Sequence, residues 1–100
     1  MPDDLDDILK ALAHPLRRDI LQWLKDPAAN FPDQQHSLEL GVCAGQIDQR
    51  AGLSQSTVSA HLATLQRAGL ITSQKVGQWH FFKRDEAAIQ AFLARFGQHL

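Results

Sequence analysis

The stretch that decides the fold is Gly52–Ile71, which reads GLSQSTVSAHLATLQRAGLI. Ser54 is a good N-cap because its hydroxyl can accept a hydrogen bond from the first turn of a helix. Apolar residues then recur at i, i+4 and i+7, the spacing of one buried helix face: Val58, Leu62 and Leu65. Gly69 stands where a left-handed residue ends a helix. The stretch predicts a helix over residues 55–68 that follows a tight turn at residues 52–54.

The segments on either side of this helix complete a recognisable unit. Residues 42–51 show helical spacing through Ile47 and Ala51 and end at Gly52. Two helices joined by so short a turn have the form of a helix-turn-helix. Residues 70–75 and 78–83, which flank Val76–Gly77, are rich in β-branched and aromatic side chains and predict a β-hairpin, the wing.

Both ends of the chain carry amphipathic helical patterns. The first has apolar residues at i, i+3, i+4 and i+7: Leu5, Ile8, Leu9 and Leu12. The last, capped by Asp85 and ending near Gly97, repeats that spacing: Ile89, Phe92, Leu93 and Phe96. His14–Pro15 separates the first pattern from a helix over residues 16–25.

One segment, Asp26–Gly41, has no period and many turn residues, so it is expected to be a loop, either a functional insertion or a mobile one. The expected element order is therefore ααααββα. The fold class is mainly α with a β-hairpin wing, a single winged helix-turn-helix domain over residues 1–100.

Composition excludes several classes of protein. The chain has 100 residues, 44% of them hydrophobic, enough for one core without disulfides or metal. Met1–Asp7 holds four aspartates and the chain has no long apolar run, so neither a signal peptide nor a membrane span is expected and the protein is predicted to be cytoplasmic. We find no nucleophile paired with a base, no phosphate-cradling loop and no catalytic carboxylate pair, so neither an enzyme nor a cofactor is predicted.

The distribution of charge favours nucleic acid more than the net charge of −1 does. No Asp or Glu occurs from Gln49 to Arg84. The polar residues expected to face outward near the start of the 55–68 helix carry hydrogen-bonding groups and no acid: Gln55, Ser56, Thr57, Ser59 and His61. Such a face suits base edges and phosphates, although it is also compatible with an ordinary polar surface. Three further residues complete the predicted set of DNA contacts: Arg67, Lys75 and Gln78.

The run Gly52–Ile71 resembles the GLSQSTVSxHLxxLxxAGL signature of the ArsR-type (arsenic-repressor-like) winged helix regulators. Leu12–Leu21 and Gly77–Phe82 resemble the start and the wing of the same family. The resemblance implies a homodimer that binds duplex DNA at an imperfect palindrome, with recognition helices in successive major grooves and repression as the favoured outcome.

The expected dimer interface consists of the two terminal apolar stripes: Leu5, Ile8, Leu9, Leu12, Ile89, Phe92, Leu93 and Phe96. Two such stripes exceed what one small core covers, and a symmetric interface would bury the surplus. The alternative is that both stripes pack on their own domain.

The family's metal sites are not reproduced in this sequence. Cys43 is the only cysteine, glycines stand two residues before and after it, and Ala87 replaces the histidine of the DxH pattern that begins at Asp85. No metal site is predicted. Cys43 is expected to be either a small buried apolar residue or, if exposed, a redox-active thiol near a helix start. The effector is not indicated.

A second function remains open, a winged helix that binds protein and not DNA. A continuous basic patch joining the 55–61 face with Arg50, Arg67 and Lys75 would favour DNA. A patch interrupted by the acidic first helix would favour a protein partner.

Overall fold

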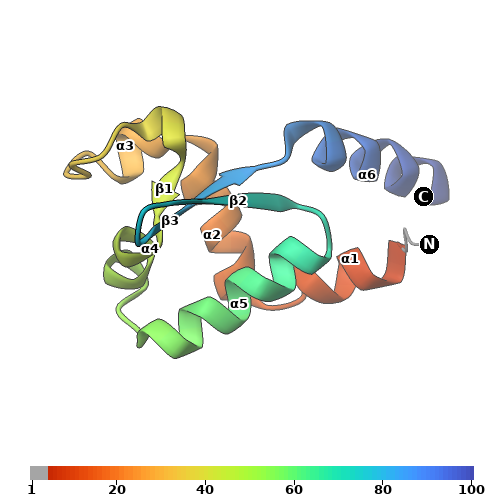
Figure 1. Ribbon diagram of the computed structural model, residues 1–100. Helices are drawn as coiled ribbons and strands as arrows, with labels where there is room; N and C mark the ends of the chain where they lie inside the picture. Colours follow the sequence, from red (N-terminus) through yellow and green to blue (C-terminus); the bar gives the residue numbers. More distant parts are fainter. Residues whose placement is uncertain (1–4) are drawn as a thin grey trace.

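A computed structural model describes residues 5–100, which form a layer of helices with a small sheet on one side (Figure 1). The helices are α1 (Leu5–Leu12), α2 (Pro15–Lys25), α3 (Pro27–Asn30), α4 (Ala44–Ala51), α5 (Gln55–Arg67) and α6 (Glu86–His99), with a 3-10 turn η1 (Leu38–Leu40). The strands are β1 (Val42–Cys43), β2 (Ile71–Val76) and β3 (Trp79–Arg84). The molecule is elongated, 42 × 25 × 24 Å, with α1 and α6 together at one end and α3 and α4 at the other.

Local capping explains where the helices around the turn begin and end. The Ser54 hydroxyl accepts the Thr57 N–H, and the Asp85 carboxylate accepts the Ala88 N–H, so both predicted N-caps are confirmed. Gly52 lies in the left-handed region (φ 69°) and ends α4, as expected. The turn between α4 and α5 is therefore determined by two local residues, the glycine that ends α4 and, two residues later, the serine that caps α5.

The sheet has one strand more than predicted. Its order is β1-β3-β2, all antiparallel, and β1 pairs Val42 with Phe82 and Cys43 with Phe81. The prediction that a helix runs from residue 42 was wrong, because α4 begins only at Ala44. Two residues are too short for a visible strand pattern, and both are buried on account of the neighbouring strand.

Gly41 fixes the point where the chain enters this sheet. Its φ of 108° is in the region that favours glycine, and a Cβ at this position would lie 2.8 Å from the Phe82 carbonyl oxygen. A side chain larger than hydrogen is therefore excluded by both the backbone conformation and the space.

The segment Asp26–Gly41, predicted as a loop without period, contains two short helical elements, α3 and η1. Asp26 caps α3 by accepting the Ala29 N–H, and Phe31 is 2% exposed in the core. The Gln34 amide donates to the carbonyls of His36 and Gly41, and its oxygen accepts the Cys43 N–H at 2.8 Å. The segment is thus fastened to the domain, which periodicity could not show because each element is shorter than five residues.

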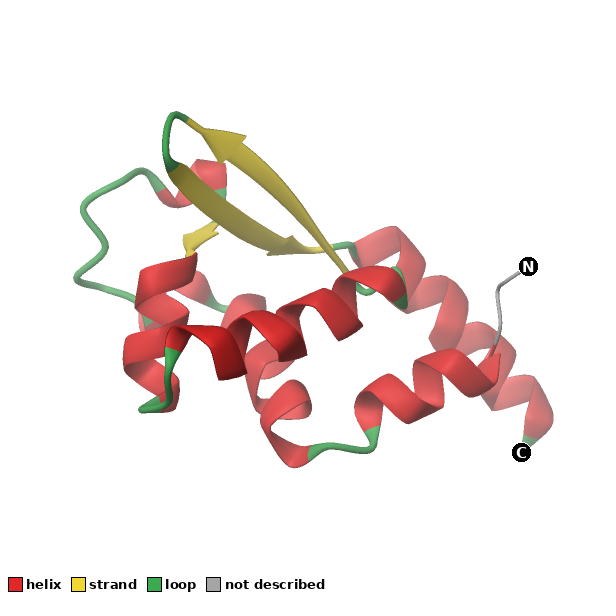
Figure 2. Ribbon diagram, turned by 60° about the horizontal axis from the view of Figure 1, so that its bottom comes forward, coloured by secondary structure: helices red, strands yellow, loops and turns green. Residues whose placement is uncertain are grey.

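The core side chains come from both the helical layer and the sheet, the parts coloured red and yellow in Figure 2. The largest fully buried side chains of the core come from α2, α4, α5, the sheet and the residue just before β2: Ile20, Val42, Ile47, Val58, Leu65, Leu70, Ile71 and Phe81. The helix-turn-helix is thereby held from behind by α2 and by the sheet. Over residues 5–100 no helix has the length and apolar character needed to span a bilayer. Asp3 and Asp4, part of the acidic start noted above, lie outside the described residues.

Candidate nucleic-acid interface

The first two turns of α5 present an open polar surface. The side chains of Gln55, Ser56, Thr57 and Ser59 are all exposed. Ser54 contacts Ser56 and Thr57 through their hydroxyl oxygens, at 3.3 and 2.9 Å, so these three side chains form a local cluster. Such hydroxyls retain acceptor or donor capacity for a ligand. Four of the predicted contact residues therefore lie together on one end of one helix.

His61 does not belong to that open surface, and its predicted outward orientation was wrong. The side chain is half-buried, and its Nδ1 lies 3.1 Å from Arg17 Nη1 of α2. Its ring lies 4.4 Å from that of His14. Burial, followed by the charges of His14 and Arg17, lowers the pKa of His61 below its ordinary value of 6.5. The sequence shows a polar residue here, but its position on the flank of the Val58–Leu65 stripe turns it toward α2.

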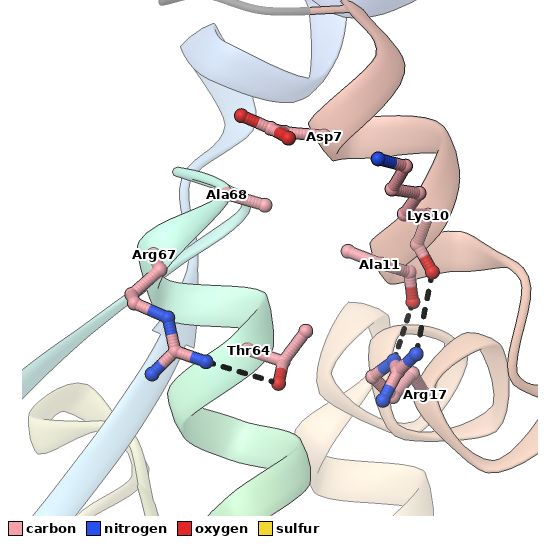
Figure 3. A pocket seen from close by; sticks show the side chains of 7 residues that line it. All are labelled: Asp7, Lys10, Ala11, Arg17, Thr64, Arg67 and Ala68. Carbon is pink, nitrogen blue, oxygen red and sulfur yellow. Dashed lines mark hydrogen bonds between the residues drawn. The ribbon is translucent and has the colours of Figure 1, made fainter.

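The C-terminal half of α5 borders a groove of about 430 Å³ that faces α1 (Figure 3). Arg67 lies on its wall and shares a 3.5 Å contact with the Thr64 hydroxyl. Lys10 and Asp7 line the opposite wall, from α1. The groove combines three cationic side chains with one carboxylate, since Arg17 lines it as well. The acidic first helix therefore does reach the basic surface at this end of α5.

The wing carries the remaining predicted contacts. Lys75 pairs across the hairpin with His80, and Gln78 is exposed in the two-residue turn that joins the strands. The wing is joined to the recognition helix by a hydrogen bond from Gln66 Nε2 to the Ser73 hydroxyl, at 3.1 Å. The two candidate DNA-contacting elements are thus in direct contact.

Arg50, which the sequence grouped with the basic patch, is engaged elsewhere. Its guanidinium lies over the ring of Trp23, 5.0 Å from the centroid, and donates to the Asn30 carbonyl at 3.3 Å. Arg84 is similarly committed, because it forms an ion pair with Glu86 at 2.8 Å. Of these two cations only Arg84 has its charge offset by a carboxylate, whereas Arg50 is exposed and keeps its charge while its guanidinium is held against Trp23 and Asn30.

The terminal helices α1 and α6 contact each other and share the predicted dimer residues. Ile89 and Phe92 are only 8% and 6% exposed, so they pack within their own chain and are not free for a partner. The other predicted interface residues remain accessible. Leu93 is 50% exposed. The remaining five are half-buried: Leu5, Ile8, Leu9, Leu12 and Phe96. The alternative of packing on the same domain thus applies to part of the α6 stripe.

Cys43 is buried, with 8% of its surface exposed, and it precedes α4 without capping it through its side chain. It borders a hollow of about 330 Å³ beside Gln34, His36 and Trp79. The redox alternative required exposure, which the structure does not give. Within residues 5–100 no three His, Cys, Asp or Glu side chains gather in a way that could hold a metal ion.

Two residues were not anticipated. Ala60 is exposed on the same face of α5 as Ser56 and offers a methyl group for apolar contact. The 100° step of the helix places it there, so the signal was available in the sequence. Arg17, which bridges α1, α2 and α5, had no comparable signal in the sequence. Two of its partners are backbone carbonyls, which any residue has, and the third is the ring of His61, 44 residues along the chain.

The comparisons with known proteins agree with this geometry. Residues 42–73, from β1 through the recognition helix into the wing, match the family model described as "Bacterial regulatory protein, arsR family". The HTH-type transcriptional regulator YbzH of Bacillus subtilis (strain 168) is 42% identical over 85 residues, which cover 83% of this chain and 85% of that protein. The transcriptional activator HlyU of Vibrio cholerae is 35% identical over 86 residues, 86% of this chain and 68% of that protein.

Solved structures show the same fold. HlyU from Vibrio cholerae has a TM-score of 0.62 at 31% identity, covering 90% of this chain and 87% of that one. The crystal structure of an ArsR family transcriptional regulator has a TM-score of 0.69, covering 98% and 91%, and at 21% identity it bears on the fold alone. These relatives are transcriptional regulators, a class that is not enzymatic. The chain is a member of the ArsR family, a winged helix-turn-helix regulator of transcription that binds DNA.

Proposed function

We propose that this protein is a sequence-specific repressor that acts as a homodimer, with α5 of each protomer in the major groove of an imperfect palindrome. The observation that carries the proposal is the acid-free, exposed face at the start of α5, formed by Gln55, Ser56, Thr57 and Ser59. A glutamine amide can bind adenine through two hydrogen bonds, and serine and threonine hydroxyls reach bases or phosphates. The major groove is wide enough to admit a helix. In this proposal the wing, where Lys75 and Gln78 are exposed, contacts the DNA backbone that flanks the major groove, and these contacts add affinity without sequence preference.

A dimer through α1 and α6 is supported by the apolar side chains that these helices leave uncovered. Leu93 is 50% exposed and Leu100 is 92% exposed, while Leu5 and Leu9 are half-buried. A two-fold interface would cover them and would set half-sites about 10 base pairs apart. We place repression first because a dimer that occupies a promoter excludes polymerase without further contacts, although HlyU is by name an activator. In this proposal the chain acts as one winged helix domain. Since its ligand is duplex DNA, we propose that it acts in the cytoplasm.

The test is selection of bound duplexes from a random pool by the purified protein, followed by binding at several salt concentrations. We expect an enriched, imperfectly palindromic site and an affinity that falls steeply with salt, because backbone contacts release counterions. Ser56→Ala and Thr57→Ala should relax the preference at one or two positions. Lys75→Ala should weaken all duplexes alike and reduce the logarithmic salt slope by about 1. Selection that enriches no site at low salt contradicts the proposal.

One observation favours a second candidate, a protein-binding winged helix. Asp7 of α1 lines the same groove as Arg67, so a carboxylate interrupts the basic surface on this side of α5. The same selection decides between the two candidates. A protein partner becomes the preferred explanation only if no duplex is enriched while the protein remains folded.

We propose that control of this regulator does not run through a metal bound at Cys43. The thiol is buried, and the described part of the chain has no cluster of metal-binding side chains. Titrating zinc and, separately, a mild oxidant against the DNA complex of wild type and Cys43→Ser tests this. Both proteins should be equally indifferent to zinc. Metal-dependent release that disappears in Cys43→Ser would contradict the proposal, and oxidant-dependent release that disappears would assign Cys43 a redox role.

A further inference from the structure

A single guanidinium, that of Arg17, connects three helices. Its Nε donates to the Ala11 carbonyl at 2.6 Å and its Nη2 donates to the Lys10 carbonyl at 3.2 Å, so it satisfies carbonyls at the end of α1. Its Nη1 lies 3.1 Å from His61 Nδ1, 44 residues along the chain in α5. Arg17 itself sits in the first turn of α2. The recognition helix is therefore tied, through one side chain, to the corner where α1 meets α2.

The chemistry of this contact fixes the protonation state of His61. Arginine has only donors, so His61 Nδ1 must accept and its proton must reside on Nε2. A second proton would go on Nδ1, and two N–H groups would then face each other across 3.1 Å. The hydrogen bond exists only while the imidazole is neutral.

The cationic groups nearest to His61 also favour its neutral form, because they lower its pKa. From the turn before α2 it faces His14, 4.4 Å between ring centroids, and from α2 it faces Arg17. Lys10 of α1, whose carbonyl accepts from Arg17, lines the groove of Figure 3 together with Arg67 and Asp7. Burial, His14 and Arg17 lower the pKa of His61. Neutral imidazole is therefore the resting form at neutral pH, and the contact with Arg17 is intact there.

α1 is also one of the two helices that we place at the dimer interface. The distance between the two recognition helices of a dimer depends on how each α5 is held relative to its own α1. That distance decides whether both helices reach successive major grooves. A tie between α5 and the end of α1 therefore bears on recognition of the whole operator.

We propose that Arg17 and His61 are positioning residues that hold the recognition helix in register with the dimer helix, so that discrimination between operator and other DNA requires an unprotonated His61. This inference rests on the proposed function. Acidification adds a positive charge near the DNA, which strengthens binding to any duplex, and at the same time breaks the tie that operator recognition needs. The quantity that changes is the ratio of the two affinities, not affinity in general.

The experiment measures binding of the full chain to the selected operator and to a scrambled duplex, from about pH 7.5 to about pH 5, at constant salt. In wild type the ratio should fall as the pH drops through the pKa of His61 and should level off about tenfold lower, at the value that His61→Leu shows at every pH. His61→Asn keeps an acceptor near the Nδ1 position, so its ratio should be near wild type at neutral pH and flat with pH. His61→Leu keeps no acceptor, so its ratio should be low, by about tenfold, and also flat.

His80→Gln is the matched control, because this histidine is exposed on β3 and lies opposite Lys75 in the wing. It should keep the wild-type pH dependence. The NMR tautomer of His61 provides a readout without DNA: Nε2–H at neutral pH in wild type, and a mixture of tautomers in Arg17→Ala. The inference is overturned if the wild-type ratio is flat with pH, if His61→Asn keeps the wild-type pH dependence, or if His61→Leu discriminates as well as wild type. A wild type that prefers no duplex at neutral pH instead contradicts the proposed function.

Discussion

The two polar sides of α5 look alike in sequence and differ in structure. On one side, Gln55 and Ser59 are exposed, and among the described residues their side chains have no hydrogen-bond partner. On the other side, His61 is half-buried and bound to Arg17. The first side can accept a ligand without giving up an internal contact. The second side can accept one only by breaking a contact that joins three helices.

The difference shows that a polar residue on a recognition helix does not necessarily contact DNA. What matters is whether its hydrogen-bonding capacity is already used. Ser54 is an intermediate case, since it both caps α5 and contacts the Ser56 and Thr57 hydroxyls. The open side of α5 should therefore govern DNA affinity with little effect on stability, and the engaged sides should govern stability and orientation.

The largest effect is expected on the side of α5 that faces the core. Leu65 is fully buried, so Leu65→Ala should lower the free energy of unfolding by about 2–5 kcal/mol through lost burial and an unfilled cavity. Chemical denaturation measures this. Ser59→Ala, on the exposed side, is the matched control and should change stability by less than about 0.5 kcal/mol. A comparable loss in both variants would contradict the division of α5 into two kinds of surface.

A new charge on the open side should affect binding and not folding. In Ser59→Asp a carboxylate faces the phosphates, so affinity for the operator should fall by about 10–100-fold, equivalent to about 1–3 kcal/mol. Stability should be preserved, because Ser59 is exposed and substitutions at exposed positions change stability little. Gln22→Glu makes the same charge change on the exposed surface of α2. Equal losses of affinity in the two variants would show that net charge, and not the position on α5, is responsible.

The capping serine has a smaller effect, and it is on stability. Ser54→Ala removes the acceptor for the Thr57 N–H, which should cost about 1 kcal/mol and lower Tm by about 4–8 °C. Ser54→Asp restores an acceptor and should recover most of that loss. Thermal unfolding at one protein concentration measures both variants. If Ser54→Asp is no more stable than Ser54→Ala, the cap does not explain the start of α5.

The smallest effect is the pH dependence of stability that comes from His61. Its pKa is lower in the folded chain than in the unfolded one, so the unfolded state takes up the proton first. The contribution to stability is complete above pH 6.5 and is lost as pH falls through the pKa of the folded state. His61→Asn should lack this part of the profile, while His99→Gln, at the exposed end of α6, should retain it. Identical profiles in wild type and His61→Asn would contradict the assignment.

The elements that were predicted correctly have strong local signals. Ser54 and Asp85 cap their helices through bonds within three residues, and the Val58–Leu65 stripe repeats over about two turns. The elements that were missed depend on distant partners. Val42 and Cys43 form a strand only because β3 lies beside them, and His61 turns inward only because Arg17 is there. For the candidate site, the sequence predicted which polar residues lie on α5. Only the structure shows which of their side chains are exposed and which, like His61, already form a contact within the domain.

Gln34 has a consequence for how this protein behaves among its own copies. β1 is an edge of the sheet, and an edge strand with free N–H groups is a template for pairing with another chain. The side-chain oxygen of Gln34 accepts a hydrogen bond from the Cys43 N–H, and its side-chain nitrogen donates one to the Gly41 carbonyl. One side chain thus substitutes for a missing neighbouring strand. The Cys43 amide should exchange its hydrogen slowly in spite of its place at an edge, and Gln34→Ala should both speed that exchange and lower the concentration at which the protein begins to aggregate.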